Sequence, residues 1–379
     1  MPSADYMRMF IYWRDTAPTR TKTMTNAWIY LITVAGASLL TACGGGSDDN
    51  ARSDHLFYQA RSFDLQAHRG GLGLYTESSI ASFSNALQMG VTTLEMDTQI
   101  TKDGVAVVTH DRKISDKKCK DTAPLTDNDP QYPYVGKYIK DLTLAQVKTM
   151  DCGSLRLADY PQQQTSPGAR MLTLREVLSL VKSYRAENVL LNIETKVEAG
   201  APHETAPREQ FVRTVLDEIQ LAGLQRQVTI QSFDWGSLML VRKLDPSLPI
   251  VALTNGQQFL QAGKPGASPW LGGIDIDEFG GDLVKAAASF GADAISPVHG
   301  DPQNGKVGDA NYVPYTTKAM VDSAHQAGIK VIPWTVSDER TLGSLIDIGV
   351  DGIITDLPDM ARQVLQAKGK ALPPPVSKR

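Results

Sequence analysis

The sequence predicts an α/β protein of the (β/α)8 TIM-barrel class. Apolar runs alternate with helical patterns along most of the chain, and this alternation is typical of a parallel sheet whose strands are joined by helices. Eight such units over roughly 300 residues fit a closed barrel. The predicted strands cover residues 65–68, 93–99, 189–194, 228–233, 250–253, 292–296, 330–336 and 352–355.

Helical patterns lie between most of these strands. They are clearest where apolar residues recur with helical spacing, at residues 174–184, 208–221, 317–327 and 338–348. Gly328 and Gly349 each follow such a pattern just before a strand, as glycine commonly does at the C-terminus of a helix. The last two strand–helix units are therefore the most clearly marked.

Residues 113–171 interrupt this alternation after the second strand and its hairpin. The segment is rich in Lys, Asp, Pro, Gln and Tyr, and a connection of this length is usually functional or carries a small structure of its own. We therefore expect an inserted segment here. The sequence does not decide whether Tyr132, Tyr134 and Tyr138 of this segment line a pocket or simply pack.

The composition excludes some classes of function. The chain has 379 residues, of which 42% are hydrophobic and 21% charged, and this is ordinary for one large globular domain with appendages. The formal net charge is -4, so no basic surplus indicates a nucleic-acid partner. Attraction for a phosphate must therefore come from a local cluster of cationic side chains.

The N-terminal residues have the pattern of a secretion signal. Basic residues precede an apolar run at residues 27–40, which is shorter than the roughly 20 residues needed to span a bilayer. The run ends in Leu40-Thr41-Ala42-Cys43, which resembles the lipid-attachment site of bacterial lipoproteins, with Cys43 as the residue that receives lipid. A buried helix with an unmodified cysteine is the alternative.

This interpretation divides the chain into parts. They are a signal with its lipid-attachment site (1–43), a flexible tether (44–54), a barrel domain (55–370, with 113–171 inserted) and a C-terminal tail (371–379). The resemblance implies an extracytoplasmic protein whose only membrane contact is its lipid. Gly44 after the cysteine favours the outer membrane, facing the periplasm or the cell surface. The oligomeric state is not predicted.

Residues 66–111 place reactive side chains where predicted strands end. In barrels and open α/β folds, chemistry is located at these ends. Glu95 and Asp97 are two residues apart on one strand, so their side chains point to the same face. Two carboxylates about 4 Å apart repel by roughly 4 kcal/mol at an effective dielectric constant of 20. We therefore expect a cation between them.

A predicted hairpin brings a histidine near these carboxylates. Asp103-Gly104 is typical of a two-residue hairpin turn. Folding the chain about this turn pairs residues whose numbers sum to 207, which places Asp97 opposite His110. A solvated hairpin with incidental charges is the alternative, but the flanking residues are apolar.

Polar residues also end other predicted strands. Glu194 and Lys196 share a face at the end of the third barrel strand, where a simple ion pair is one interpretation. Trp334 lies in the seventh strand, where packing in the core is one interpretation. Asp356 ends the eighth strand and is expected to cap the structure, and His299 is a weak candidate for a substrate contact.

The order of these motifs resembles that of the glycerophosphodiester phosphodiesterase family over roughly residues 63–365. The matching residues are His68-Arg69-Gly70, Glu77, Glu95-x-Asp97, Thr101-x-Asp103-Gly104, His110-Asp111 and Glu194-x-Lys196. One departure is visible, because the family usually has Pro-Glu-Asn-Thr where this chain has Tyr75-Thr76-Glu77-Ser78-Ser79. The glutamate is kept, and either serine can still cap the following helix.

The resemblance implies a role for each matching residue. Glu95, Asp97 and Glu194 would hold one divalent cation, and ligands that are all oxygen favour Ca²⁺ or Mg²⁺ over zinc. His68 and His110 would act as general acid and base, which suits imidazole near neutral pH. Substrate-binding roles are implied for Arg69 and Lys196, which would contact the phosphate, and for Trp334, which would pack against the glycerol carbons.

The implied function is metal-dependent hydrolysis of a small-molecule glycerophosphodiester to sn-glycerol 3-phosphate and an alcohol. A phospholipase D-like enzyme that cleaves lysophospholipids on the same scaffold is one alternative. A non-catalytic surface-binding lipoprotein is another.

If lipid occupies Cys43, the remaining cysteines are an even pair in a secreted chain, so we predict a disulfide between Cys119 and Cys152.

Overall fold

The computed structural model describes residues 52–60 and 62–378. The predicted signal, the lipid attachment at Cys43 and most of the predicted tether lie outside this part of the chain. The described residues belong to one compact unit. Among them, no helix is both long enough and apolar enough to cross a membrane.

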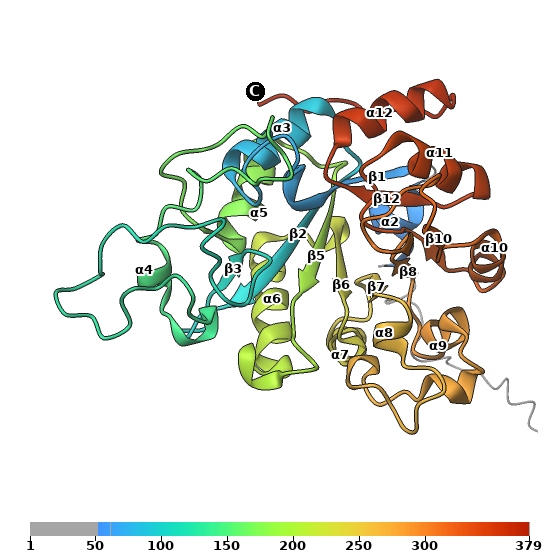
Figure 1. Ribbon diagram of the computed structural model, residues 1–379, viewed down its shortest axis with the longest axis horizontal. Coiled ribbons are helices and arrows are strands. Elements are labelled where there is room, and N and C mark those ends of the chain that lie inside the picture. The colour runs from blue at the N-terminus through green and yellow to red at the C-terminus, as the bar shows by residue number, and fades with distance from the viewer. Residues whose placement is uncertain (1–51, 61, 379) are drawn as a thin grey trace, which may run out of the picture. The chain divides into compact units, whose positions relative to one another are not determined.

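Eight parallel strands form the centre of the fold, which confirms the predicted fold class (Figure 1). Their order in the sheet is β11-β8-β7-β6-β5-β2-β1-β12, so strands that follow one another in the chain are neighbours. The strands are β1 (Asp64–Ala67), β2 (Thr93–Ile100), β5 (Leu190–Thr195), β6 (Val228–Ser232), β7 (Ile250–Thr254), β8 (Ala294–Pro297), β11 (Lys330–Val331) and β12 (Gly352–Thr355).

Backbone hydrogen bonds connect the two ends of this strand order. No continuous ladder joins β11 to β12 within the described residues. However, the amide of Asp351 donates to the Val331 carbonyl (2.9 Å), and that of Ile354 donates to the Pro333 carbonyl (3.0 Å). Strand β11 is much shorter than the predicted strand 330–336, since Pro333 has no amide hydrogen to donate to a ladder.

Helices follow most of the strands, as the sequence predicts. Helix α5 shows why these segments are helical, because Thr173 and Glu176 form a capping box and four apolar residues at helical spacing are buried. The longer helices are α3 (Ile80–Met89), α5 (Leu174–Ser183), α6 (Arg208–Ala222), α7 (Trp235–Leu244), α9 (Leu283–Ser289), α10 (Lys318–Gln326), α11 (Glu339–Ile348) and α12 (Pro358–Ala367).

Short elements make up the connections. The short α-helices are α2 (Leu56–Gln59), α4 (Leu144–Val147) and α8 (Gln257–Leu260), and the short strands are β3 (Ala106–Val108), β4 (Leu172–Thr173), β9 (Gly300–Asp301) and β10 (Val313–Pro314). Six 3-10 helices complete the described chain: η1 (His68–Gly70), η2 (Ile139–Asp141), η3 (Pro202–Glu204), η4 (Gln225–Gln227), η5 (Pro269–Leu271) and η6 (Ile276–Phe279).

The β2–β3 hairpin exists, but its predicted register is wrong by one residue. The paired residues sum to 206, for example Thr98 with Val108, and Thr109 rather than His110 lies opposite Asp97. The turn has three residues because the Val105 amide donates to the Thr101 hydroxyl and Gly104 adopts a left-handed conformation (φ 80°). A glycine in this position is typical of three-residue hairpin loops.

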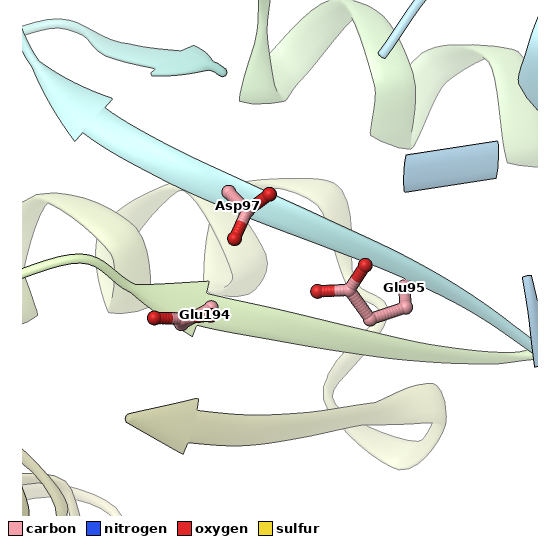
Figure 2. A group of neighbouring side chains, drawn as sticks. All are labelled: Glu95, Asp97 and Glu194. Atoms are coloured by element: carbon pink, nitrogen blue, oxygen red, sulfur yellow. The ribbon is translucent and has the colours of Figure 1, made fainter. Parts of the chain in front are cut away.

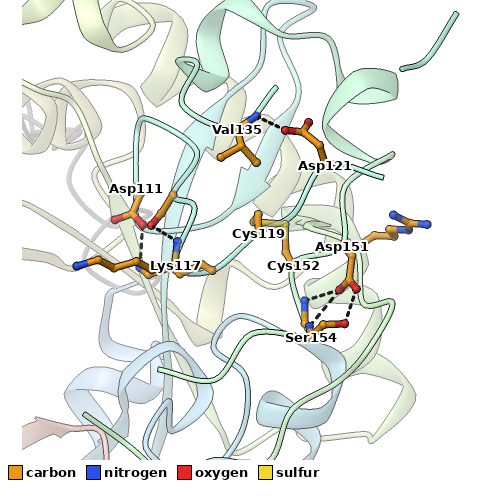
Figure 3. Close-up of a disulfide and its surroundings, with 12 residues drawn as sticks. Asp111, Lys117, Cys119, Asp121, Val135, Asp151, Cys152 and Ser154 are labelled. Carbon is orange, nitrogen blue, oxygen red and sulfur yellow. Dashed lines mark hydrogen bonds and ion pairs between the residues drawn. A yellow bond between two sulfur atoms is a disulfide. The ribbon is translucent and has the colours of Figure 1, made fainter. Parts of the chain in front are cut away.

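The inserted segment has a small core of its own and a disulfide. Cys119 and Cys152 are bonded, with their Cα atoms 4.0 Å apart, which is the pairing that the sequence predicts (Figure 3). Around the disulfide, the Val135 amide and Ser154 hydrogen-bond to aspartate side chains. The apolar residues of this core are Val107, Ile114, Tyr134, Ile139, Leu142, Val147, Met150 and Met171.

The described residues at both ends of the chain pack against the barrel. Phe57 of α2 is buried against Leu190 and Ala294, the first residues of β5 and β8. Helix α2 therefore covers the end of the barrel where the strands begin. Beyond α12, the amide of Val376 donates to the carbonyl of Leu87 at the end of α3 (2.8 Å).

Candidate active site

Three buried carboxylates meet at the centre of the parallel sheet. Glu95 and Asp97 extend from β2, and Glu194 extends from the neighbouring strand β5 (Figure 2). Strand register explains their proximity, because Asp97 pairs directly with Glu194. One oxygen of each side chain lies within 4.8 Å of the others. The structure thus brings together the three residues that the sequence predicts as metal ligands.

Two cationic side chains balance part of this negative charge. Arg69 Nε lies 2.9 Å from Asp97 Oδ2, and Lys196 Nζ lies 3.1 Å from Glu194 Oε1 and 3.7 Å from Asp97 Oδ1. Burial alone would raise the pKa of Asp97, but the charges of Arg69 and Lys196 hold it below its usual value. Arg69 and Lys196 thus supply positive charge beside Asp97 and Glu194.

Glu95 is fixed by hydrogen bonds from two different elements. The backbone amide of Arg69 donates to Glu95 Oε2 (2.9 Å), and Gln231 Nε2 of β6 donates to Glu95 Oε1 (2.8 Å). Arg69 can direct its amide here because its backbone is left-handed (φ 51°), which is uncommon for a residue other than glycine. Gln231 was not among the site residues predicted from the sequence.

The three carboxylates fit a divalent cation. All their donor atoms are oxygens, the set that Ca²⁺ and Mg²⁺ prefer. Asp97 Oδ2 is buried without a hydrogen bond, because its contact with Arg69 is not aligned for one. Burial and the charge of Asp97 raise the pKa of Glu194 to about 8, and burial and Asp97 also raise that of Glu95. A bound cation would offset this mutual repulsion.

His68 is held by a buried aspartate at the end of β12. Its Nδ1 lies 2.5 Å from Asp356 Oδ1, while the hydroxyls of Tyr160 (2.5 Å) and Ser337 (3.2 Å) donate to Asp356 Oδ2. The expectation that Asp356 merely caps the structure is wrong. Leu357, not Asp356, is the N-cap residue of α12, and Asp356 orients the imidazole.

His110 belongs to a chain of charged groups that leads into the insertion. Its Nδ1 lies 2.8 Å from Asp111 Oδ1, and Lys118 bridges Asp111 (2.9 Å) and Glu77 (3.0 Å). Although 36% of the His110 side chain is exposed, enclosure by the site lowers its pKa to about 4, with help from Arg69 and Lys196. The ring is therefore neutral near pH 7.

A cavity of about 270 Å³ joins these groups at the carboxyl ends of the strands. Every predicted catalytic, metal and substrate residue lines it, together with Gln231, Phe233, Leu253, Gln303, Thr335 and Ile354. The predicted residues in the lining are His68, Arg69, Glu95, Asp97, His110, Glu194, Lys196 and Trp334.

Other residues singled out in the sequence lie elsewhere. His299 is 3% exposed and its Nδ1 lies 2.9 Å from the Tyr312 hydroxyl, so the expectation of a substrate contact is not supported by its position. Tyr134 is fully buried in the core of the insertion, with Tyr132 packed against it. Tyr138, by contrast, lines a large cavity beside the site.

Residues 68–360 match the model of the glycerophosphoryl diester phosphodiesterase family. This chain belongs to that family. A family relative from Caldanaerobacter subterraneus subsp. tengcongensis, a glycerophosphodiester phosphodiesterase, is 27% identical over 303 residues, which cover 80% of this chain and 98% of the relative.

Solved structures of similar proteins agree with the fold. A glycerophosphoryl diester phosphodiesterase from Silicibacter pomeroyi has a TM-score of 0.68 at 26% identity, covering 85% of this chain and 99% of its own. A phosphodiesterase from Oleispira antarctica, solved with the product sn-glycerol-3-phosphate, has a TM-score of 0.57 at 20% identity, covering 80% and 97%. At that identity, the second likeness supports the fold alone.

Proposed function

We propose that this protein hydrolyses glycerophosphodiesters to sn-glycerol 3-phosphate and an alcohol. One observation carries the proposal: three carboxylates, two histidines and two cationic side chains line a single cavity at the carboxyl ends of the barrel strands. Membership of the family supports the same reaction. The proposed ligands of a Ca²⁺ or Mg²⁺ ion are Glu95, Asp97 and Glu194.

The cationic side chains bind and orient the phosphate. A diester carries one negative charge, and more charge gathers on its non-bridging oxygens in the transition state. Arg69 and Lys196 stabilise this charge from fixed positions, and the divalent cation, when bound, adds Lewis-acid stabilisation. Trp334, whose indole nitrogen donates to the Ser296 carbonyl (3.0 Å), offers its ring to the glycerol carbons.

The two histidines exchange protons with the nucleophile and the leaving oxygen. In each ring Nδ1 faces a carboxylate, Asp356 for His68 and Asp111 for His110, which leaves Nε2 for the substrate. Each aspartate also stabilises the positive ring that forms when Nε2 accepts a proton. With its pKa lowered to about 4, the His110 ring is neutral near pH 7 and free to accept a proton in general acid–base catalysis.

Product analysis tests the proposal. Purified protein is incubated with glycerophosphocholine and, separately, with lysophosphatidylcholine, and sn-glycerol 3-phosphate, choline and lysophosphatidic acid are measured. The proposal expects sn-glycerol 3-phosphate and choline from the first substrate. Preferential release of lysophosphatidic acid from the second would instead support the phospholipase D-like alternative, and no hydrolysis of either would favour a binding protein.

We also propose that Cys43 carries lipid and holds the barrel outside the cytoplasm, at the outer membrane, through the tether at residues 44–54. The disulfide between Cys119 and Cys152 supports an oxidising compartment. Expression of the full chain with and without Cys43→Ala in a lipoprotein-processing bacterium, followed by membrane fractionation and mass measurement, tests this. A membrane-bound Cys43→Ala protein of unchanged mass would contradict it.

A further inference from the structure

A second, larger cavity adjoins the catalytic one. Its volume is about 850 Å³, against about 270 Å³ for the catalytic cavity. The two share His110, Glu194, Lys196 and Phe233, so they are continuous at the proposed metal site. Ligand sites usually measure about 300 to 1,000 Å³. Together the two cavities offer room for a diester with an alcohol on each side of its phosphate.

Aromatic rings line the path between the two cavities. Phe233 contacts Trp334 edge-on (centroids 5.4 Å apart) and Phe259 edge-on (5.2 Å), and Phe259 stacks on Trp270 (4.2 Å). None of these four rings is fully buried. They offer apolar surface to a ligand, since Phe233, Phe259 and Trp270 line the larger cavity.

Hydrogen-bonding groups lie beside these rings. Arg112 pairs with Glu198 (2.9 Å) and with Glu204, and the Tyr138 hydroxyl donates to Glu204 (2.7 Å). Gly200 lies between Glu198 and the aromatic ring of Trp270. A Cβ atom at this position would lie 3.2 Å from Glu198 Oε1 and 3.4 Å from an atom of the Trp270 ring. One ligand can therefore contact both kinds of group.

The charges around the larger cavity nearly balance. Four cationic and five anionic side chains line it: Arg112, Lys113, Lys117 and Lys196, and Asp111, Asp116, Glu194, Glu198 and Glu204. A lining so close to neutral gives a charged head group little electrostatic advantage. Paired carboxylates, a guanidinium and a phenol instead offer many donors and acceptors to hydroxyl groups.

We propose that the larger cavity binds the head-group alcohol of the diester and selects a neutral ring polyol, such as inositol or a sugar. The ring carbons pack on Phe259 and Trp270. The hydroxyls form hydrogen bonds with Arg112 and its partners Glu198, Glu204 and Tyr138. This inference rests on the proposed function. It adds to that function the chemical class of the head group.

Competition between substrates tests the proposal. We expect kcat/KM for glycerophosphoinositol to exceed that for glycerophosphocholine at least tenfold. Trp270→Ala should lower kcat/KM for glycerophosphoinositol about tenfold, while Trp270→Phe retains most of it. Tyr138→Phe, which keeps the ring and removes one hydroxyl, should cause a smaller loss of about three- to fivefold. Leu221→Ala, at an exposed position on α6, is the matched control.

The outcomes separate this proposal from the proposed function. Equal kcat/KM values for the two substrates, or a preference for glycerophosphocholine, would overturn the polyol subsite and leave the hydrolase intact. If Trp270→Ala lowered kcat/KM equally for glycerophosphoinositol and glycerophosphocholine, the polyol subsite would likewise be overturned. Failure to hydrolyse any diester would overturn the function itself, and the subsite with it.

A different observation carries a second inference. Side-chain amides form a hydrogen-bonded chain through the barrel interior between two buried carboxylates. Gln231 Nε2 donates to Glu95, and Gln66 Nε2 donates to Asp64 (2.7 Å). Asn192 lies between the glutamines, and its Nδ2 donates to the carbonyl oxygen of each (2.8 Å in both bonds). All five side chains are buried.

The direction of each hydrogen bond in this series of side chains depends on its middle residue, Asn192. The carboxylates of Asp64 and Glu95 at the two ends accept hydrogen bonds. The two glutamines therefore turn their NH₂ groups toward these carboxylates and their carbonyl oxygens toward Asn192. A group with two hydrogens must therefore stand between them, and the asparagine amide provides both. Its own oxygen accepts from the Thr229 hydroxyl (3.0 Å). We infer that Asn192 is a positioning residue, which sets the orientation of Gln231 and thereby that of the proposed metal ligand Glu95.

Metal titration tests this inference without relying on activity. We expect Asn192→Asp to weaken Mg²⁺ or Ca²⁺ binding, measured by calorimetry, by 10- to 100-fold, as changes behind a metal ligand commonly do. Thr229→Val, a milder change, should weaken it about threefold. Gln227→Glu is the matched control, because this buried amide donates to two carbonyl oxygens away from the site. Equal affinity in Asn192→Asp and the parent, or equal weakening in the control, would overturn the role.

Discussion

The proposed metal site and the inserted segment are held in place in different ways. Glu95, Asp97 and Glu194 lie on β2 and β5, whose register is fixed by six pairs of residues, and each of the three carboxylates is at most 5% exposed. The insertion has little regular structure and depends on its own apolar core and one disulfide. Changes in the first region should therefore abolish the reaction, whereas changes in the second should alter stability or substrate choice.

Removal of the cation should have the largest effect. With EDTA, we expect release of sn-glycerol 3-phosphate to fall to background, because the three carboxylates then repel one another and the phosphate loses its main counter-charge. Adding Ca²⁺ or Mg²⁺ in excess should restore the rate and identify the ion. Undiminished hydrolysis after exhaustive chelation would contradict a metal-dependent centre.

Loss of either catalytic imidazole should have the second-largest effect on the reaction. His68→Ala and His110→Ala should each reduce kcat by on the order of 10² to 10⁴, the usual contribution of general acid–base catalysis. Far-ultraviolet circular dichroism of each variant checks its fold. If either variant kept full activity, that histidine would have no part in the reaction.

Asp356→Asn should have a smaller effect, on the order of 10² in kcat, because an amide cannot hold the His68 tautomer as the carboxylate does. Steady-state kinetics measure this loss. The matched control is Asp322→Asn, which removes an exposed carboxylate paired with Lys318 on α10. An unchanged kcat for Asp356→Asn would show that the contact with His68 is only structural.

The pH dependence of metal binding should distinguish the buried carboxylates from exposed ones. Because the pKa of Glu194 is raised to about 8, the metal-free site holds a proton there at pH 6 to 7, and a cation must displace it. The dissociation constant for Mg²⁺ should therefore fall about tenfold from pH 6 to 7 and about fivefold from pH 7 to 8. Calorimetry in two buffers with different ionisation enthalpies also counts the protons released, and a dissociation constant independent of pH would contradict this.

Removal of the disulfide should affect stability more than chemistry. Cys119→Ala/Cys152→Ala should lower the free energy of unfolding by on the order of 3 to 4 kcal/mol, since the bridge closes a loop of 33 residues. Thermal unfolding with and without reductant measures this. We expect kcat to change less than threefold. A loss of kcat as large as that of the histidine variants would remove the distinction between the two regions.

The sequence by itself determined the class of fold and most of the residues at its centre. Alternation of apolar runs with helical patterns is a local property of the chain, and so is the placement of Glu95, Asp97 and Glu194 on two predicted strands. Parallel strands that follow one another in a barrel lie side by side, which suffices to bring these three carboxylates together.

Only the tertiary structure decided which distant residues touch. His68 and Asp356 are separated by 288 positions and meet because the first and last strands, β1 and β12, are neighbours. Gln231 reaches Glu95 across the barrel interior, and one hydroxyl at Thr101 shifts the hairpin register by one residue. Such contacts depend on the exact register and side-chain geometry of packed elements, which local apolar patterns do not encode.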